Sequence, residues 1–199
     1  MKLLSTERTD ICLLAPDHAR HLQDYLLENR SHLAPFEPLR NDDYFTLDTI
    51  AQRISSARRE YDEKRSLMLV FTLKNEPQII GSINFTNFVF GVFQACYLGF
   101  SLDRACQGKG LMREALEQAI RYVRENYGIH RIMANHLPDN VRSSNTLKSL
   151  GFVQEGYALM NPLMILVKII KLRWIHILSY DQMVSRKINN QTTRCANSI

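Results

Sequence analysis

The sequence predicts a mixed α/β domain in which helices pack against a sheet. Three apolar segments, residues 67–73, 79–88 and 95–103, have the length of strands, and short turns with Pro77 and Gly91 separate them. Strands joined by such short turns favour an antiparallel meander. A long amphipathic helix and a fourth strand-like segment follow the meander, and this strand–helix–strand order favours a parallel crossover.

Two helices are expected before the meander. The first follows Pro16 and places Leu22, Tyr25, Leu26 and Asn29 on one side. The apolar positions of the second recur every three or four residues, which is the period of one helix face. These positions are Leu47, Ile50, Ala51, Ile54, Ala57 and Tyr61.

The clearest helix begins at residue 111, directly after a glycine-rich turn. Its apolar face follows helical spacing and consists of Leu111, Met112, Ala115, Leu116, Ala119, Ile120 and Val123. Asn126 and Gly128 are expected to end this helix. Residues 129–136, which are short and rich in Ile and Met, are predicted to form the strand that completes the crossover.

The last part of the pattern is a helix followed by strands. Residues 141–150 predict a short helix that ends at Gly151, and residues 152–159 predict a strand. The apolar stretch 158–173 is expected to supply two buried strands, because its apolar run is too short to cross a bilayer.

The chain has 199 residues, which suits a single domain, and its excess of positive charge is confined to one end. Residues 1–157 have 19 Lys+Arg and 19 Asp+Glu, whereas residues 158–199 have six basic residues and one acid. We expect one domain over residues 3–180 and a basic C-terminal tail over residues 181–199. The tail is expected either to be solvated or to contact RNA or a ribosome.

Composition also limits the class of protein. The four cysteines, Cys12, Cys96, Cys106 and Cys195, show no metal-type spacing and are expected to be reduced thiols, so we predict a cytoplasmic protein without a metal site. The first ten residues have no long apolar core, and a secretory signal is not expected.

The turn before the strongest helix, within ACQGKGLMREAL at residues 105–116, has the composition of an anion-binding loop. Unpaired N–H groups and the helix dipole at a strand-to-helix junction suit a phosphate or pyrophosphate, and Lys109 adds charge. A tight turn that needs glycine only for steric reasons is the alternative. A P-loop is excluded by Arg104 and by the missing Ser or Thr, and a dinucleotide fingerprint is excluded by Arg113 at its third glycine position.

Two motifs resemble those of the GNAT N-acetyltransferases. Residues 107–112, QGKGLM, resemble the Q/R-x-x-G-x-G/A pyrophosphate loop of that family, from which Met112 departs. Residues 140–143, NVRS, followed by Leu150-Gly151-Phe152, resemble its N-x-x-S…GF segment. The resemblance is closer to the RimJ/RimL-like branch, the ribosomal-protein alanine N-acetyltransferases. It covers residues 3–157 and includes TERT at 6–9, PFEP at 35–38, YLGFSLDRACQGKGLMREAL at 97–116 and HRIMANHLPDNVRSSNTLKSLGFVQEGY at 130–157.

This resemblance implies the GNAT fold, a mixed and mostly antiparallel sheet with helices on both faces. The sheet would splay at its centre, between the strand ending near Asp103 and the strand at 129–136, and the co-substrate acetyl-CoA would lie in the splay. Its pyrophosphate would bind the N–H groups of residues 107–112, and its pantetheine arm would pair with backbone near Phe100 and Leu102. The implied contacts are Phe100, Leu102, Gln107, Gly108, Lys109, Gly110, Leu111, Met112 and Asn140.

The resemblance also implies direct attack of an amine on the thioester, so that no cysteine is needed as a nucleophile. Ser143 is the implied catalytic residue, as the proton donor to the leaving thiolate; the alternative is that it only caps or decorates the helix at 141–150. The base is left open between Glu37, Asp42 and a water relay. Glu155 is interpreted first as structural.

The implied activity is acetylation of the N-terminal alanine amine of a ribosomal protein, with a possible ribosome contact through the tail. The alternatives are a small-amine acetyltransferase that acts on a polyamine, and a non-catalytic acetyl-CoA-binding or ribosome-assembly module. Neither DNA nor a membrane is expected as a partner. The chain departs from the family near its end, where Trp174-Ile175-His176 stands in place of a W-x-D-H motif. The substrate side of the site, which this segment forms in the family, is therefore expected to differ from the family pattern.

Overall fold

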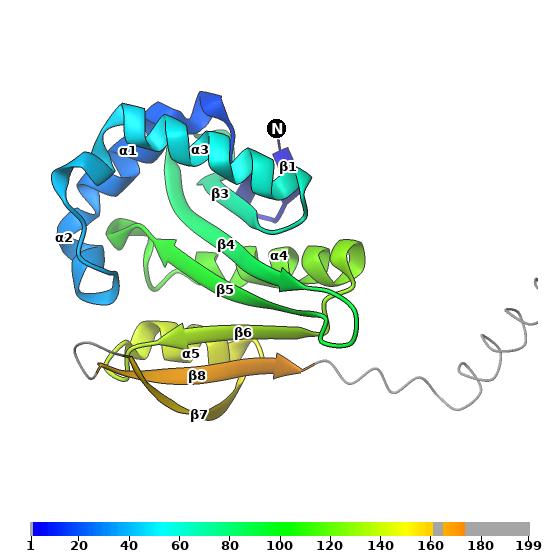
Figure 1. The fold of residues 1–199 in the computed structure, drawn as a ribbon. Coiled ribbons are helices and arrows are strands. Elements are labelled where there is room, and N and C mark those ends of the chain that lie inside the picture. The colour runs from blue at the N-terminus through cyan, green and yellow to red at the C-terminus, as the bar shows by residue number, and fades with distance from the viewer. Residues whose placement is uncertain (1, 161–164, 174–199) are drawn as a thin grey trace, which may run out of the picture.

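The computed structural model of the protein describes residues 2–160 and 165–173, whose strands form one eight-stranded sheet in the order β1-β2-β3-β4-β5-β6-β8-β7 (Figure 1). Every neighbouring pair is antiparallel except β5 and β6, which are parallel and joined by the long helix α4. The strands are β1 Lys2–Ser5, β2 Thr9–Leu13, β3 Leu67–Leu73, β4 Ile79–Val89, β5 Ala95–Leu102, β6 Arg131–His136, β7 Val153–Met160 and β8 Ile165–Arg173. The predicted meander and crossover are therefore confirmed.

Helices cover both faces of this sheet, as predicted. They are α1 Ala19–Glu28, α2 Arg30–Leu33, α3 Leu47–Asp62, α4 Leu111–Tyr127 and α5 Val141–Ser149. The side chains of β3 pack alternately into two apolar clusters, because successive side chains of a strand point to opposite faces of the sheet. Leu69 and Phe71 pack in the cluster that contains the apolar face of α4, whereas Val70 packs in the cluster formed with α1 and α3.

The parallel pair splays apart after only three residue pairs. Ala95, Cys96 and Tyr97 pair with residues 131–133, and the ladder stops there. Residues 98–102 of β5 remain paired with β4, and residues 134–136 of β6 remain paired with β8. The two halves of the sheet therefore diverge at this point, and beyond Tyr97 one edge of β5 has no neighbouring strand among the described residues. This confirms the splay that the resemblance implies.

The helix ends follow the glycine pattern. Gly128 ends α4 with φ +65°, and Gly151 follows α5 with φ +83°, a left-handed conformation that glycine adopts without steric cost. Thr46, which the sequence analysis did not single out, caps α3 by accepting a hydrogen bond from the Thr49 N–H.

The hairpin of β1 and β2 was not predicted. Its first strand has only four residues and lies at the edge of the sheet, so its sequence pattern is short. The turn is closed by Thr6, whose N–H donates to the Thr9 carbonyl over 2.8 Å and whose hydroxyl is 2.7 Å from that of Thr9. The hairpin places Arg8 beside the start of α4.

Several sequence predictions fall outside the described residues: the boundary at residue 180, the tail at 181–199, residues 174–176 and Cys195. Cys12, Cys96 and Cys106 have free thiols. No helix of the described ranges is long and apolar enough to cross a membrane. The same residues contain no group of three potential metal ligands.

Candidate functional site

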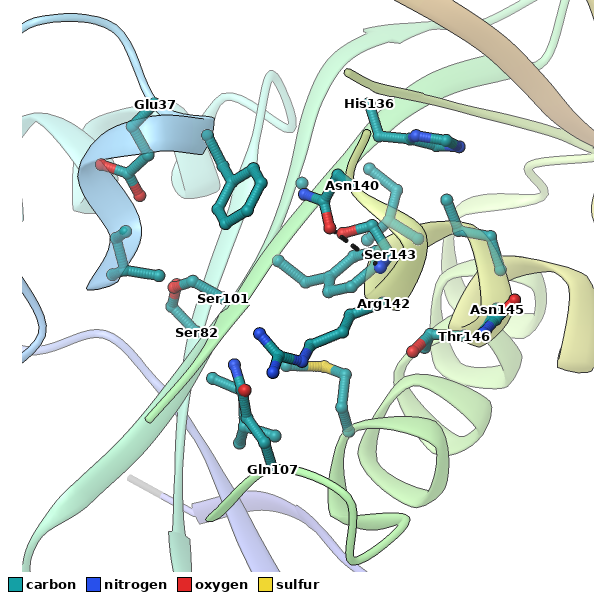
Figure 2. A pocket seen from close by; sticks show the side chains of 18 of the residues that line it. Glu37, Ser82, Ser101, Gln107, His136, Asn140, Arg142, Ser143, Asn145 and Thr146 are labelled. Atoms are coloured by element: carbon teal, nitrogen blue, oxygen red, sulfur yellow. Dashed lines mark hydrogen bonds between the residues drawn. The ribbon is translucent and has the colours of Figure 1, made fainter. Parts of the chain in front are cut away.

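A cavity of about 590 Å³ lies where the sheet splays (Figure 2). Its walls come from α2, the end of β5, the loop before α4, the end of β6 and α5. Elements far apart in the sequence therefore meet around one space, which is in the size range of small-molecule sites.

The structure brings together most of the residues predicted from the sequence. The cavity is lined by Phe100, Leu102, Gln107, Gly108, Gly110, Leu111, Met112, Asn140 and Ser143. Lys109 is exposed and is not among the lining residues, although its backbone carbonyl accepts a hydrogen bond from Arg8 over 2.8 Å. The lysine therefore contributes to the shape of the loop through its backbone.

The glycine-rich loop leaves room for a ligand at the start of α4. Gly108 and Gly110 have φ values of +73° and +76°, and a Cβ atom at Gly108 would meet nothing within 4 Å. Gly110 is the N-cap of α4 and provides no side-chain capping bond. The first N–H groups of this 17-residue helix therefore have no capping side chain, and its dipole is positive at that end. This arrangement fits an anionic group such as a pyrophosphate.

Asn140, and not Ser143, caps α5. The Asn140 Oδ1 atom accepts a hydrogen bond from the Ser143 N–H over 3.1 Å, as the dashed line in Figure 2 shows. The Ser143 hydroxyl has no hydrogen-bond partner among the described residues and lines the cavity. The Ser143 side chain therefore does not cap α5, and its catalytic role stays a prediction beside the alternative that it only decorates the helix.

Gln107 and Asn29 fix the cavity wall from the side of α1 and α2. The Gln107 Nε2 atom is 2.7 Å from the His32 Nε2 atom. The buried Asn29 side chain donates to Asp103 over 2.8 Å and accepts from the Arg104 N–H over 3.0 Å. These contacts tie the segment between β5 and the loop to the first helices.

Of the three carboxylates considered from the sequence, only one lines the cavity. Glu37, which follows the 3₁₀ turn Ala34–Phe36, lines the cavity. Asp42 lies outside it and forms an ion pair with Arg30 at 2.7 Å. Glu155 is exposed and is not part of the cavity wall.

Sequence reasoning missed several polar lining residues. Arg113 and Arg142 line the cavity, and the available signal was that Arg113 directly follows the loop motif at 107–112 and that Arg142 lies within the motif at 140–143. His136 is also part of the wall and is only 6% exposed. Its Nδ1 atom is 2.7 Å from the Leu137 carbonyl oxygen, and its buried Nε2 atom has no partner within the described residues. The cavity therefore offers positive charge near the loop and an unused ring nitrogen near the end of β6.

Cys96 and Cys106 do not have the properties of nucleophiles. Burial raises the pKa of the Cys96 thiol to about 12. Burial, together with the Asp103 carboxylate, raises the pKa of Cys106, which packs against the main core and does not line the cavity. Because the thiolate is the reactive form, neither group is activated for acyl transfer.

Comparison with known proteins shows one matching family model and a similar acetyltransferase. The family model for the acetyltransferase (GNAT) domain matches residues 11–153. The chain is 42% identical over 155 residues to the [ribosomal protein uS5]-alanine N-acetyltransferase of Escherichia coli K12, which covers 78% of this chain and 80% of that protein.

Solved structures agree with this similarity. The ribosomal-protein-S5-alanine acetyltransferase of Vibrio fischeri superposes with a TM-score of 0.82 at 32% identity, over 87% of this chain and 97% of that one. RimJ of Mycobacterium smegmatis, solved with CoA-disulfide, has a TM-score of 0.79 at 19% identity over 90% and 89% of the two chains, which supports the fold alone. The matched domain and these similarities together show that the chain belongs to the GNAT acetyltransferase family.

Proposed function

We propose that this chain is an acetyl-CoA-dependent N-acetyltransferase that acts on the N-terminal alanine amine of a ribosomal protein. The observation that supports it most is that the uncapped start of α4, the unpaired edge of β5 and the free Ser143 hydroxyl face one cavity. The names of the similar proteins, which act on ribosomal protein uS5, support the choice of acceptor.

The residues present fit acetyl-CoA. Gly108 leaves open space before the α4 N-terminus for a pyrophosphate, and Arg113 and Arg142 add positive charge at the cavity wall. The backbone of β5 near Phe100 and Leu102 has a free edge that an extended pantetheine arm can pair with. Acetyl-CoA, when bound, supplies the acetyl group as a reactive thioester.

Residues of this chain would accept and donate the protons of the reaction and stabilise its negative charge. A backbone N–H on the free edge of β5 is placed to stabilise negative charge on a carbonyl oxygen. Among the three acids considered, Glu37 is proposed as the proton acceptor, because it alone lines the cavity. The Ser143 hydroxyl is proposed to supply a proton on the opposite wall. The unreactive cysteines favour direct transfer over an acyl-enzyme.

A chain of hydroxyl groups provides a polar surface for the incoming amine. Tyr25, on α1, donates to the Ser101 hydroxyl over 2.8 Å, and the Ser82 hydroxyl is 2.9 Å from that of Ser101. Burial raises the pKa of Tyr25, so this phenol stays a proton donor at neutral pH. These groups lie on the α1 and α3 side of the sheet, at the boundary of the cavity.

Residues 3–180 are proposed as the catalytic domain and residues 181–199 as a basic tail that contacts ribosomal RNA. The tail has Arg186, Lys187 and Arg194 against the single acid Asp181. We propose that the reaction occurs in the cytoplasm, because the proposed acceptor is a ribosomal protein. Truncation after Tyr180 is expected to leave acetyl-CoA affinity unchanged and to flatten the salt dependence of ribosome binding. An unchanged salt dependence would contradict the role of the tail.

An acceptor panel tests the proposed function against its two alternatives. The full chain is incubated with acetyl-CoA and either an Ala-initiated peptide, a polyamine or no acceptor, and free CoA is measured. Turnover with the peptide supports the proposal. Turnover with the polyamine alone supports a small-amine enzyme, and acetyl-CoA binding without turnover supports a non-catalytic module.

A further inference from the structure

A second cavity, of about 500 Å³, lies between α1, α3 and the face of β3, β4 and β5 that these helices cover. It adjoins the first cavity, because five residues line both: Glu37, Arg40, Ser82, Asn84 and Ser101. No residue of the loop 107–112 lines it. The second cavity therefore extends from the proposed amine site, on the side away from the co-substrate loop.

Arg53 of α3 lines this second cavity with an incomplete set of partners. Its guanidinium carbon lies 4.1 Å from the centroid of the Tyr44 ring, and that of Arg40 lies 4.4 Å from the same centroid. The Arg53 Nη1 atom is buried and has no hydrogen-bond partner within residues 2–160 and 165–173. A buried donor without a partner costs free energy, and it is a group that a ligand can satisfy.

The acids near this cavity do not neutralise Arg53. Glu60 lies seven residues further along α3, which is about 10 Å along the helix axis. Its Oε2 atom already accepts a hydrogen bond from the Ser66 hydroxyl over 2.6 Å. Glu37 lies at the boundary with the first cavity. Neither acid forms an ion pair with Arg53 in the described part of the chain.

We propose that the second cavity binds the first few residues of the acceptor polypeptide and that Arg53 recognises an acidic side chain among them. A guanidinium group with a free N–H suits a carboxylate, which it can bind through charge-assisted hydrogen bonds. The nearby Arg40 adds a second positive charge, so that a bound carboxylate offsets repulsion between the two. The inference rests on the proposed function, since it extends the acceptor site of the same reaction.

Peptides that differ in one group test this inference. A set of Ala-initiated hexapeptide amides has a single Glu at position 2, 3, 4, 5 or 6, and a matched set has Gln instead. Binding is measured by calorimetric titration of the full chain with a saturating CoA concentration, and acetylation is measured separately. For at least one position, we expect the Glu peptide to bind about tenfold more tightly than its Gln counterpart, which is equivalent to about 1.4 kcal/mol, because hydrogen bonds between charged groups are stronger than those between neutral groups.

Two variants on the same helix separate recognition from general charge effects. Arg53→Gln is expected to abolish the preference for Glu, and Arg53→Lys is expected to retain part of it. Arg58→Gln is the matched control: Arg58 is also on α3 and contacts a tyrosine ring, but it pairs with Asp62 and lines neither cavity. The control is expected to keep the full preference. If Arg53→Gln fails to fold, the Arg53→Lys variant and the wild-type comparison still decide the question.

The outcomes separate this inference from the proposed function. Equal binding of the Glu and Gln peptides by the wild type, or no binding of either, overturns the inference. A Gln peptide with a free C-terminal carboxylate that binds as tightly as the Glu peptide overturns it as well, because the site would then recognise a chain end. Glu-selective binding without acetylation supports the second cavity as a peptide site and contradicts the proposed function. Acetylation without Glu-selective binding supports the proposed function and contradicts the peptide site.

Discussion

Arg8 and Glu114 are 106 residues apart in the sequence and form a two-point contact at the start of α4. The Arg8 backbone N–H donates to Glu114 Oε1 over 3.0 Å, and the Arg8 Nε donates to Glu114 Oε2 over 2.7 Å. The same guanidinium group donates to the Lys109 carbonyl. Arg8 therefore connects the β1–β2 hairpin to the glycine-rich loop and holds that loop in shape for its ligand.

Replacing Arg8 should weaken acetyl-CoA binding without unfolding the protein. Because Arg8→Ala removes the loop contact and leaves Glu114 near the phosphate site, we expect the Kd for acetyl-CoA to rise about tenfold, equivalent to about 1.4 kcal/mol. Lys2→Ala is the control, since it removes an exposed ion pair with Asp10 on the same hairpin and leaves the loop untouched. Titration calorimetry measures both; equal Kd values would show that the loop does not depend on Arg8.

The pH dependence of this contact has a defined direction. Desolvation by burial raises the pKa of Glu114, but hydrogen bonds from Thr6 and Arg8 and the charge of Arg8 outweigh it, so the pKa lies below 4.5. A carboxyl group whose pKa is lowered by folding contributes stability above its unfolded pKa and loses it as the pH falls through the folded value. The difference in the free energy of unfolding between the wild type and Arg8→Ala should therefore shrink as the pH falls below about 4.5.

A side chain at Gly110 should block the co-substrate. In Gly110→Asp, a carboxylate occupies the space above the α4 N-terminus and repels a pyrophosphate, so we expect the affinity for acetyl-CoA to fall more than about 100-fold. Gly91→Asp is the control, because Gly91 also has a left-handed φ, +75°, and lines neither cavity. Both variants place an Asp side chain at a left-handed φ, but only the first should lose binding. Loss of affinity in both would trace the effect to strain.

Removing the Ser143 hydroxyl should slow the reaction with little change in KM. A proton donor acts mainly in the transition state, and such groups typically contribute about 100- to 10,000-fold in rate. Ser149→Ala, on the same helix, is the control, because the Ser149 hydroxyl bonds the Thr146 carbonyl and lies outside the cavity. Steady-state kinetics with wild-type kcat for Ser143→Ala would exclude the proposed role.

Neutralising Glu37 should also lower kcat. Glu37→Gln keeps the size of the side chain and removes its capacity to accept a proton, so we expect at least a 100-fold decrease in kcat. Asp42→Asn tests the neighbouring acid, which pairs with Arg30 outside the cavity, and it is expected to retain kcat. The same kinetic effect in both variants would point to the charge of the loop and not to a base.

The sequence predicts the parts of this molecule that depend on local pattern. The face of α4 and the turn before it follow from apolar period and glycine placement, and both were located to within a residue or two. The hairpin at residues 2–13 was missed because its strands are short. The spacing of Asn140 and Ser143 also fits an N-cap, but only the folded structure shows that Asn140 accepts the capping bond and that the Ser143 hydroxyl has no partner among the described residues.

Contacts between distant segments could not be predicted. The resemblance included Arg8 within TERT, but nothing local indicates that it reaches Glu114. Arg53 belongs to the polar side of a well-predicted helix, where an arginine is usually solvated. Its role depends on Tyr44 and on a cavity between two layers, which exist only in the folded chain.

The identity of the acceptor amine tests the central claim most directly. An α-amine has a pKa near 8 and a lysine near 10.4, so forming the neutral amine at pH 7 costs about 1.4 and about 4.6 kcal/mol, respectively. Of the three carboxylates considered, Glu37 alone lines the cavity. A site with so few bases suits the amine whose neutral form costs less free energy to make. Two peptides are compared by mass spectrometry: one with a free N-terminal Ala and no lysine, the other N-terminally blocked with an internal lysine. The account predicts acetylation of the first and almost none of the second; comparable or faster modification of the blocked peptide would contradict it.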